Sequence, residues 1–249
     1  MKSADYIYGD GSSSFVDALL DECLAHPAVH HPYLRRLADG HYPVHHLAVR
    51  DYARQYGVYS ASFTQALRNV RDRIRSEQER QIIDQNLLEE EGDSEAINLA
   101  ELPHRELFRR FSEQVGANDT DNANLDICLT VRIWTRLFLE KCATDPVEVG
   151  IGAIGLGTEL VVPCIYPMLL QAVDRVDVAN PQEARMFFAL HLGADDDHGR
   201  AFVRIAKDHA TTHESREALR FGALSSLNLR QSFYDVMDAR ASEMKIVPN

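Results

Sequence analysis

Two histidines and an aspartate in the last third of the chain have the types and spacing of metal ligands. If this stretch is a helix, at about 100° per residue, His191, Asp195 and His198 fall within one sector roughly 60° wide. Asp196 and Asp197 point elsewhere. Two imidazoles and a carboxylate are costly to bury without a partner, and a divalent iron, manganese or zinc ion would supply one. The alternative interpretation is a solvated acidic loop, because three consecutive aspartates lie beside a glycine.

A second candidate ligand is Glu159, which is the sole charged residue between Glu148 and Asp174. An ionised carboxylate in such an apolar stretch must be paired or bound to a metal ion. The sequence leaves both possibilities open, because an arginine such as Arg132 or Arg136 could form the ion pair.

Three glutamates end a predicted helix in the run Asn86-Leu87-Leu88-Glu89-Glu90-Glu91-Gly92. Negative charge at the C-terminus of a helix opposes the helix macrodipole. A solvated charge run explains this pattern, and so does a metal ion that compensates one of the carboxylates.

The elements that must position these residues are helices, as apolar periodicity, capping residues and prolines indicate. No stretch shows sustained period-2 alternation, and no linker rich in Pro, Gly or Ser divides the chain. We therefore predict an all-α bundle of about seven to nine helices, with residues 1–249 as a single domain and 1–12 as a loose N-terminal segment. The predicted helices cover residues 15–25, 32–38, 43–75, 77–91, 104–115, 122–142, 147–176, 181–209 and 214–244.

An aromatic stripe follows the long helix predicted over residues 43–75. Tyr52, Tyr56, Tyr59 and Phe63 recur at helical spacing, which is more typical of a core than of a binding site. Buried phenol oxygens need hydrogen-bond partners, so the stripe would also suit one wall of a polar cavity.

Three glycines in the helix predicted over residues 147–176, Gly150, Gly152 and Gly155, match a dinucleotide-binding fingerprint, but no strand precedes them. We expect Gly150, Gly152, Gly155 and Gly157 to let this helix approach a neighbouring helix closely. Pro163 is expected to kink the same helix near the candidate carboxylate.

Composition excludes several classes of function. The net charge of −12 and the pI of about 5.3 argue against binding to nucleic acid or to an anionic membrane. Cys23, Cys128, Cys142 and Cys164 are scattered, which indicates neither a zinc knuckle nor a redox dithiol. The N-terminus lacks the apolar core of a signal peptide, and no uninterrupted apolar run approaches the roughly 18 residues of a membrane span. We expect a cytoplasmic protein that acts on a small molecule, and we allow for a homodimer.

The candidate residues, taken in order, resemble the heme-oxygenase-like diiron oxidase superfamily, which is related in fold to the TenA thiaminases and the pyrroloquinoline quinone synthases. The resemblance rests on Glu-Glu-Gly, a later histidine, the carboxylate ahead of Pro163 and the His-x3-Asp-x2-His motif. It implies a helical bundle around two irons, and Glu90 is chosen over Glu89 and Glu91 because it lies two residues before Gly92. The ligands that it implies are Glu90, His104, Glu159, His191, Asp195 and His198.

The resemblance also implies an enzyme that uses O2, with two Fe(II) ions per chain and O2 as co-substrate. Relatives act on amino acids or fatty acids by N-oxygenation, desaturation or C–C cleavage, in biosynthetic pathways. Asp51 and Asp72 do not match the position of a seventh ligand, so the second iron is expected to bind more weakly. The arginines that could hold the carboxylate of an amino-acid-like substrate are Arg50, Arg54, Arg132 and Arg136. Two alternatives remain: a metal-free enzyme of the TenA type and a non-catalytic, partner-binding helical scaffold.

Overall fold

The computed structural model of the chain describes residues 11–92, 98–118, 126–144, 146–192 and 197–245. Every regular element in these residues is helical, as the sequence predicts. In chain order the elements are α1 (Gly11–Leu24), α2 (Pro32–Ala38), α3 (His45–Ser60), α4 (Phe63–Arg71), α5 (Glu77–Glu91), the 3₁₀ turn η1 (Leu99–Glu101), α6 (His104–Gln114), α7 (Leu129–Thr144), α8 (Val147–Ile151), the π-helical segment η3 (Gly152–Leu156), the 3₁₀ turn η4 (Glu159–Val161), α9 (Val162–Val173), α10 (Pro181–Leu190), α11 (Asp197–His209) and α12 (His213–Glu243).

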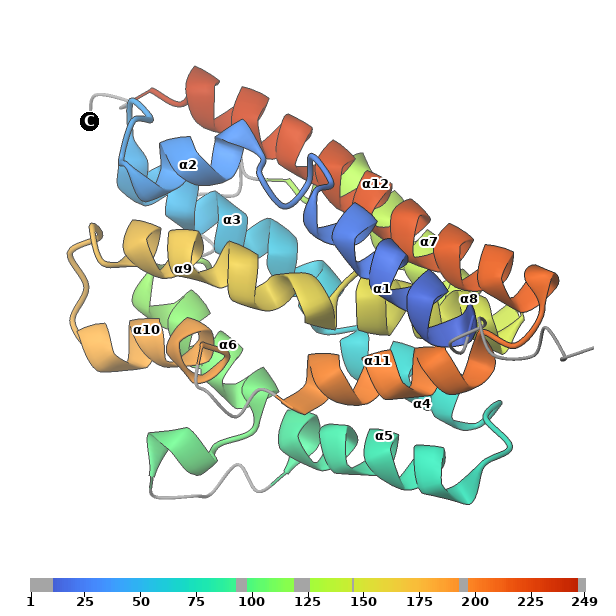
Figure 1. Cartoon of the computed structure of the whole chain (residues 1–249). Helices are drawn as coiled ribbons and strands as arrows, with labels where there is room; N and C mark the ends of the chain where they lie inside the picture. Colours follow the sequence, from blue (N-terminus) through green and yellow to red (C-terminus); the bar gives the residue numbers. More distant parts are fainter. Residues whose placement is uncertain (1–10, 93–97, 119–125, 145, 193–196, 246–249) are drawn as a thin grey trace, which may run out of the picture.

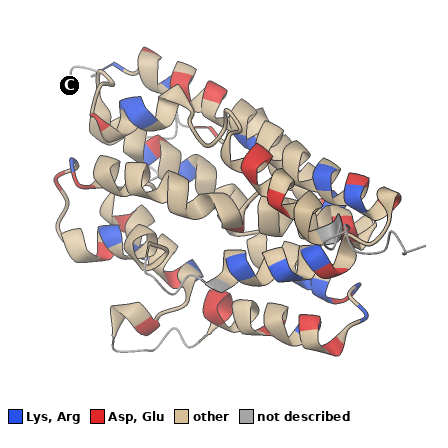
Figure 2. Cartoon of the chain, viewed as in Figure 1, with Lys and Arg blue, Asp and Glu red and all other residues tan. Residues whose placement is uncertain are grey.

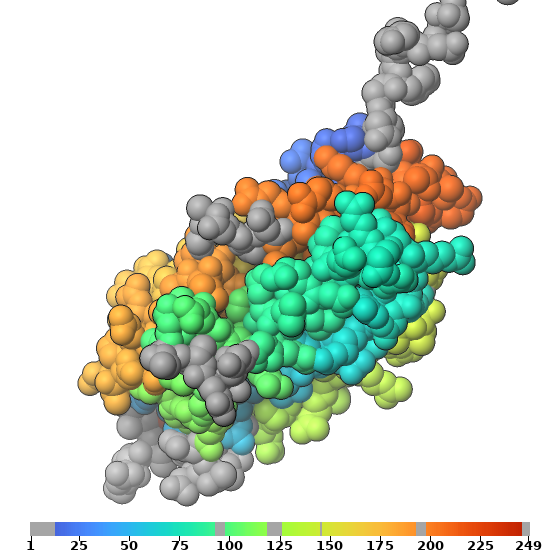
Figure 3. Space-filling model, turned by 90° about the horizontal axis from the view of Figure 1, so that it is seen from below, coloured from blue at the N-terminus to red at the C-terminus, as the bar shows by residue number. Residues whose placement is uncertain are grey.

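The long helix α12 runs along one side of the bundle, and α5 lies on the opposite side (Figure 1). α12 packs against α8 and η3, while α5 packs against α4, α6 and α11. Seen from the side of α5, this helix covers much of the surface and α11 lies beside it (Figure 3). Acidic residues predominate on α5, and basic residues gather on α11 (Figure 2). The two neighbouring helices therefore carry charges of opposite sign.

Local signals in the sequence determine where several helices begin. Pro32 occupies the first turn of α2, where its missing N–H costs little. The side chain of Ser76 accepts a hydrogen bond from the backbone of Glu79 at the start of α5. Asn180 accepts one in the same way from Glu183 at the start of α10. The predicted bounds of α2 and α5 are confirmed by the structure.

Two of the long helices predicted from the sequence are broken near the centre of the protein. The helix predicted over residues 43–75 divides into α3 and α4, because Ser62 Oγ donates to the carbonyl oxygen of Tyr59 and competes with the helical hydrogen bonds. The helix predicted over residues 147–176 divides at Gly157 and Thr158. There the N–H of Gly157 bonds to the carbonyl of Gly152, and Thr158 Oγ1 donates to Ala153. The kink expected from Pro163 therefore lies a few residues earlier.

The helix predicted over residues 181–209 is also divided, into the two helices α10 and α11. α10 ends at Leu190, with His191 as its C-cap, and α11 begins at Asp197. Glycine and aspartate are poor helix formers, and acidic residues favour the start of a helix over its interior. At the other end of the chain α1 begins at Gly11, so the last two residues of the expected loose segment are helical.

α12 packs unusually close to α8 and η3 at two glycines, Gly152 and Gly222. A Cβ atom on Gly152 would overlap the backbone oxygen of Leu219, and one on Gly222 would overlap the backbone oxygen of Val149. The predicted close approach of the glycine-containing helix is thus confirmed. The stretch Val147–Val173 is apolar enough for a membrane span by composition, with a mean hydropathy of 1.6, but 83% of that window is buried inside the protein. It is a core segment in this structure.

A histidine between two glutamates ties α5, α8 and α11 together. His209 Nδ1 lies 3.1 Å from Glu148 Oε1, and its Nε2 lies 3.2 Å from Glu79 Oε2. Burial lowers the pKa of His209, but the hydrogen bonds and charges of Glu148 and Glu79 raise it more, so the net shift is upward.

This cluster predicts a pH-dependent contribution to stability. A raised pKa in the folded state means that protonated His209 stabilises the fold below about pH 6.5 and that this contribution is lost as pH rises through the folded pKa. We expect His209→Gln to lower the free energy of unfolding by about 1 kcal/mol at pH 6 and by less at pH 9. Urea unfolding at the two pH values measures the difference. His45→Gln is the control, because His45 bonds to the carbonyl of Ala172; an equal pH effect in both variants would contradict the assignment.

Candidate metal centre

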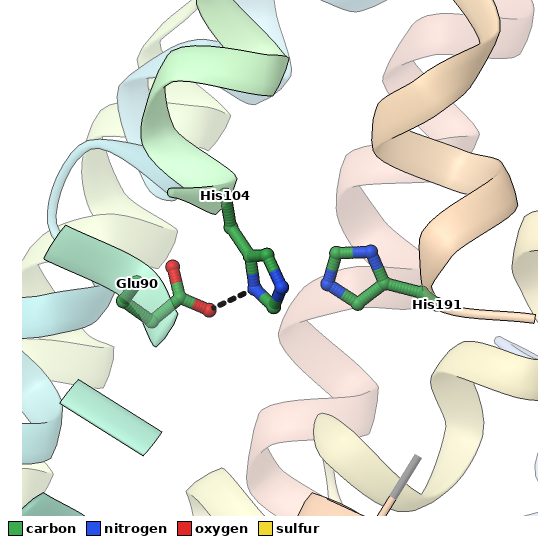
Figure 4. Close-up of side chains that lie close together, drawn as sticks. All are labelled: Glu90, His104 and His191. Atoms are coloured by element: carbon green, nitrogen blue, oxygen red, sulfur yellow. Dashed lines mark hydrogen bonds and ion pairs between the residues drawn. The ribbon is translucent and has the colours of Figure 1, made fainter. Parts of the chain in front are cut away.

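Three of the sequence-predicted ligands converge from three helices. Glu90 lies in the last turn of α5, His104 begins α6 and His191 caps α10. Each residue offers one ligand atom, and these atoms lie within 4.8 Å of one another (Figure 4). The imidazole rings of His104 and His191 have centroids 4.3 Å apart. Residues separated by about 100 positions in the chain therefore form one group of nitrogen and oxygen donors.

The ring of His191 is held in an orientation that suits metal binding. Its Nδ1 lies 2.6 Å from the carbonyl oxygen of Phe187, so Nδ1 carries the proton and Nε2 keeps its lone pair. Burial, together with the charge of the neighbouring His104, lowers the pKa of His191 to about 3. His191 is therefore neutral at physiological pH.

His104 differs, because Glu90 lies against it. The Nδ1 atom of His104 and the Oε1 atom of Glu90 are 2.9 Å apart, and both side chains are largely buried. Burial lowers the pKa of His104, but the hydrogen bond and the charge of Glu90 raise it more, and the net shift is upward. The two histidines of the group therefore have opposite pKa shifts.

The three consecutive glutamates at the end of α5 point to three different partners. Glu90 contacts His104, whereas Glu89 Oε2 lies 2.7 Å from Nε2 of His198 on α11. The hydrogen bond from His198 lowers the pKa of Glu89 to about 2. Glu91 forms an ion pair with Arg68. Glu90 is thus the glutamate that faces the histidine group, as the motif suggested.

Glu159 lies in η4 and faces the same interior space. Together with Glu90 and His191 it lines a small cavity of about 30 Å³, and Tyr56 and Tyr59 are also part of the lining. The side chain of Glu159 is almost fully buried and accepts a hydrogen bond from Asn86 at 3.3 Å. The cavity is large enough for a water molecule, and two carboxylates and an imidazole are part of its lining.

The remaining predicted residues are placed as follows. The ring centroids of His198 and His104 are 6.1 Å apart, so His198 lies at the edge of the group. Asp195 lies outside the described residues. The argument that His191, Asp195 and His198 share one face of a helix is wrong, because α10 ends before His191. Arg132 and Arg136 are exposed on α7, while Glu159 is buried among the interior residues.

No further carboxylate reaches the group from α3 or α4 among the described residues. Asp51 is fully buried, but Arg240 donates two hydrogen bonds to it, at 2.7 and 2.9 Å. Asp72 is a surface residue that pairs with Arg71. Both carboxylates therefore belong to other interactions.

The donor set fits a transition metal ion of the iron type. Two imidazole nitrogens and carboxylate oxygens are the ligands that suit iron, and an oriented imidazole with a free Nε2 lone pair is typical of a metal-binding histidine. Burial makes the group costly without such an ion, because Glu90 and Glu159 bring two carboxylates to one small cavity.

Two residues of the site were missed by sequence reasoning. Asn86 is buried, donates to Glu159, and has an Oδ1 atom without a partner among the described residues. Tyr166 also lines the small cavity; its hydroxyl lies 3.3 Å from that of Tyr56, and burial raises its pKa well above the usual value. The position of Asn86 one turn before Glu90 was an available signal, whereas nothing in the sequence marked Tyr166.

Comparisons with known proteins agree with this fold. Residues 50–231 match a family described as iron-containing redox enzymes. A TenA homologue from Pseudomonas syringae is 12% identical, with a TM-score of 0.72, and the match covers 95% of this chain and 99% of that one. A CADD-like protein of unknown function from Nostoc punctiforme is 15% identical, with a TM-score of 0.71 and the same coverage.

A third similar structure is described by its fold. A domain of unknown function with a heme oxygenase-like fold, from Shewanella denitrificans, is 16% identical with a TM-score of 0.65, over 91% of this chain and 90% of that one. The predicted heme-oxygenase-like fold is confirmed by these likenesses. A comparison with curated proteins found no match.

Proposed function

Because the chain belongs to the iron-containing redox enzyme family, we propose that it is an O2-dependent, non-haem diiron oxidase that acts on a small metabolite. The observation that carries the proposal is the convergence of Glu90, His104 and His191 from three helices onto one buried group. Neither a solvent-exposed run of glutamates nor a histidine that merely packs in the core would require these three side chains to converge.

The proposed ligands are Glu90, His104, Glu159, His191, Asp195 and His198, for about two Fe(II) ions per chain. Two Fe(II) ions held by these residues would supply the electrons and the Lewis acidity for the activation of O2. The proposed substrates are amino-acid-like or fatty-acid-like compounds, and the proposed outcomes are N-oxygenation, desaturation or C–C cleavage.

The protein's own residues prepare the site for this chemistry. The carbonyl of Phe187 fixes the ring of His191, and Asn86 fixes the carboxylate of Glu159. The aromatic side chains of Tyr56 and Tyr166 help to exclude water from the cavity, and burial keeps the hydroxyl of Tyr166 protonated. Tyr166 can therefore donate a hydrogen bond inside the cavity.

Anaerobic titration with Fe(II) tests the proposal. We expect about two Fe(II) ions to bind per chain at neutral pH, the second more weakly. The affinity should fall as pH falls, beginning above pH 6.5, because the raised pKa of His104 lets protons compete with the metal ion there. His191 adds little to this dependence, since it is already neutral.

The matched control for the titration is a histidine outside the group. His191→Gln should remove most Fe(II) binding, whereas His209→Gln should retain it, because His209 contacts Glu79 and Glu148 at a different place in the fold. Exposure of the Fe(II) protein to O2 should then change its absorbance only where iron is bound. If wild type binds no iron at any pH, the diiron proposal fails and a metal-free enzyme, with the His104–Glu90 pair as its acid–base group, takes its place.

A further inference from the structure

A second, larger cavity opens next to the candidate metal centre. It has a volume of about 370 Å³ and lies between α3 and α6, and Glu90 forms part of its wall. Ser60 and Glu90 line both this cavity and the small one beside His191. A volume in this range is typical of sites for small organic ligands. The larger cavity thus shares a carboxylate with the proposed metal site.

Two arginines line this cavity without a carboxylate partner among the described residues. They are Arg54 on α3, which is half-buried, and Arg105 on α6, which is exposed. A third arginine on the same wall, Arg109, is already engaged by Glu106 and Glu113. In a chain with 38 acidic and 26 basic residues, this cavity thus presents two guanidinium groups that pair with no carboxylate among the described residues. They form a local site of positive charge that favours an anion.

Part of the lining of this cavity is apolar. Gly57, Val58 and Phe108 line it, and a Cβ atom on Gly57 would lie 3.2 Å from the ring of Phe108. The absence of a side chain at Gly57 therefore lets the ring of Phe108 pack closely against α3. The apolar part of a ligand fits such a lining. A carboxylate of the ligand next to Glu90 would be repelled by the carboxylate of Glu90.

We propose that this cavity binds a small organic anion with an apolar body, whose charged group is held by Arg54 and Arg105 and whose apolar part points toward Glu90. Planar guanidinium groups bind carboxylates through paired hydrogen bonds, which orients the ligand as well as attracting it. If the proposed function holds, this anion is the substrate, and the arginines determine which of its atoms faces the metal centre. Binding itself requires no metal ion.

The structure thereby distinguishes among the four arginines that the sequence offered. Arg132 and Arg136 are exposed on α7, and neither they nor Arg50 lines this cavity. Arg54 does line it. Arg105 was not among the sequence candidates, because its place at the same cavity as Arg54 depends on the packing of α6 against α3.

Calorimetric titration of the full-length, iron-free protein tests the proposal with hexanoate, hexyl phosphate and the neutral analogue hexanamide. We expect saturable binding of at least one of the two anions and much weaker binding of hexanamide. Arg54→Gln and Arg105→Gln should each weaken anion binding about tenfold, the usual effect of losing one charge-assisted hydrogen bond. Arg132→Gln is the matched control and should bind as wild type does.

A steric variant tests the position of the apolar body. Val58→Phe should weaken binding of the anion without changing its preference over hexanamide, and circular dichroism should verify that each variant is folded. Unchanged affinity in both Arg54→Gln and Arg105→Gln, or equal binding of hexanamide and hexanoate, would overturn the proposal. Because neither iron nor O2 is present in this assay, its outcome is independent of whether the protein binds Fe(II).

Discussion

Replacement of Glu159 by glutamine is expected to remove the iron-dependent rise in melting temperature and to leave the iron-free protein nearly as stable as wild type. Glu159 is buried and shares a small cavity with Glu90 and His191. In the iron-free protein the change relieves repulsion between two nearby carboxylates, and Asn86 can still donate to the remaining oxygen. With a metal ion, a ligand at this position confers stability that grows with free metal concentration, about 2.7 kcal/mol at one hundred times Kd.

Thermal melts of both proteins, with and without Fe(II) under anaerobic conditions, measure this effect. Glu148→Gln is the control, because Glu148 contacts His209 outside the cavity. An iron-induced rise of equal size in wild type and Glu159→Gln would show that Glu159 is not a ligand. A large loss of stability in the iron-free variant would instead indicate a structural carboxylate whose partner is left uncompensated.

The parts of the fold that follow from local chemistry could be predicted from the sequence. The bounds of α5 follow from the Ser76 cap and from Gly92, and those of α2 follow from Pro32. Both sets of signals act within one or two turns of the chain, so no tertiary contact is needed to interpret them.

The breaks in the long helices could not be predicted in this way. The π-helical segment Gly152–Leu156 and the turn at Thr158 satisfy their hydrogen bonds in an irregular manner that the packing of α12 supports. Apolar periodicity continues through such a break, and so the pattern indicates one helix where the chain forms two. Glu159 lies just beyond this break, which is why its side chain reaches the cavity.

The candidate site shows the same division. The residue types and their order in the chain indicated Glu90, His104 and His191, which the structure brings together. The helical-phase argument for His198 was wrong, because α11 begins only at Asp197 and is a separate helix. His198 nevertheless faces Glu89, since α11 packs beside α5. Contacts between helices decide such pairings, and a single sequence does not specify them.

Replacement of Gly222 by alanine is expected to lower the free energy of unfolding strongly, because Gly222 lies where α12 touches α8. The added Cβ would overlap the backbone oxygen of Val149 in the neighbouring helix α8. Backbone atoms of a packed helix cannot move aside as the end of a side chain can. Overpacking of this kind costs about 3 kcal/mol, a large part of the 5–15 kcal/mol by which most domains are stable. Helix propensity alone predicts the opposite sign, because alanine favours a helix by about 1 kcal/mol over glycine.

Gly199→Ala is the matched control for this change, since a Cβ there would lie 3.5 Å from the Cα of Leu160, an ordinary contact. We expect urea unfolding of the iron-free proteins to show a lower midpoint for Gly222→Ala and an unchanged or higher midpoint for Gly199→Ala. α8 continues through η3 to Glu159, so a displaced α8 should also reduce the stabilisation of Gly222→Ala by Fe(II). Equal or greater stability of Gly222→Ala would mean that α8 and α12 are farther apart than the structure has them, and the position of Glu159 would then need to be reconsidered with theirs.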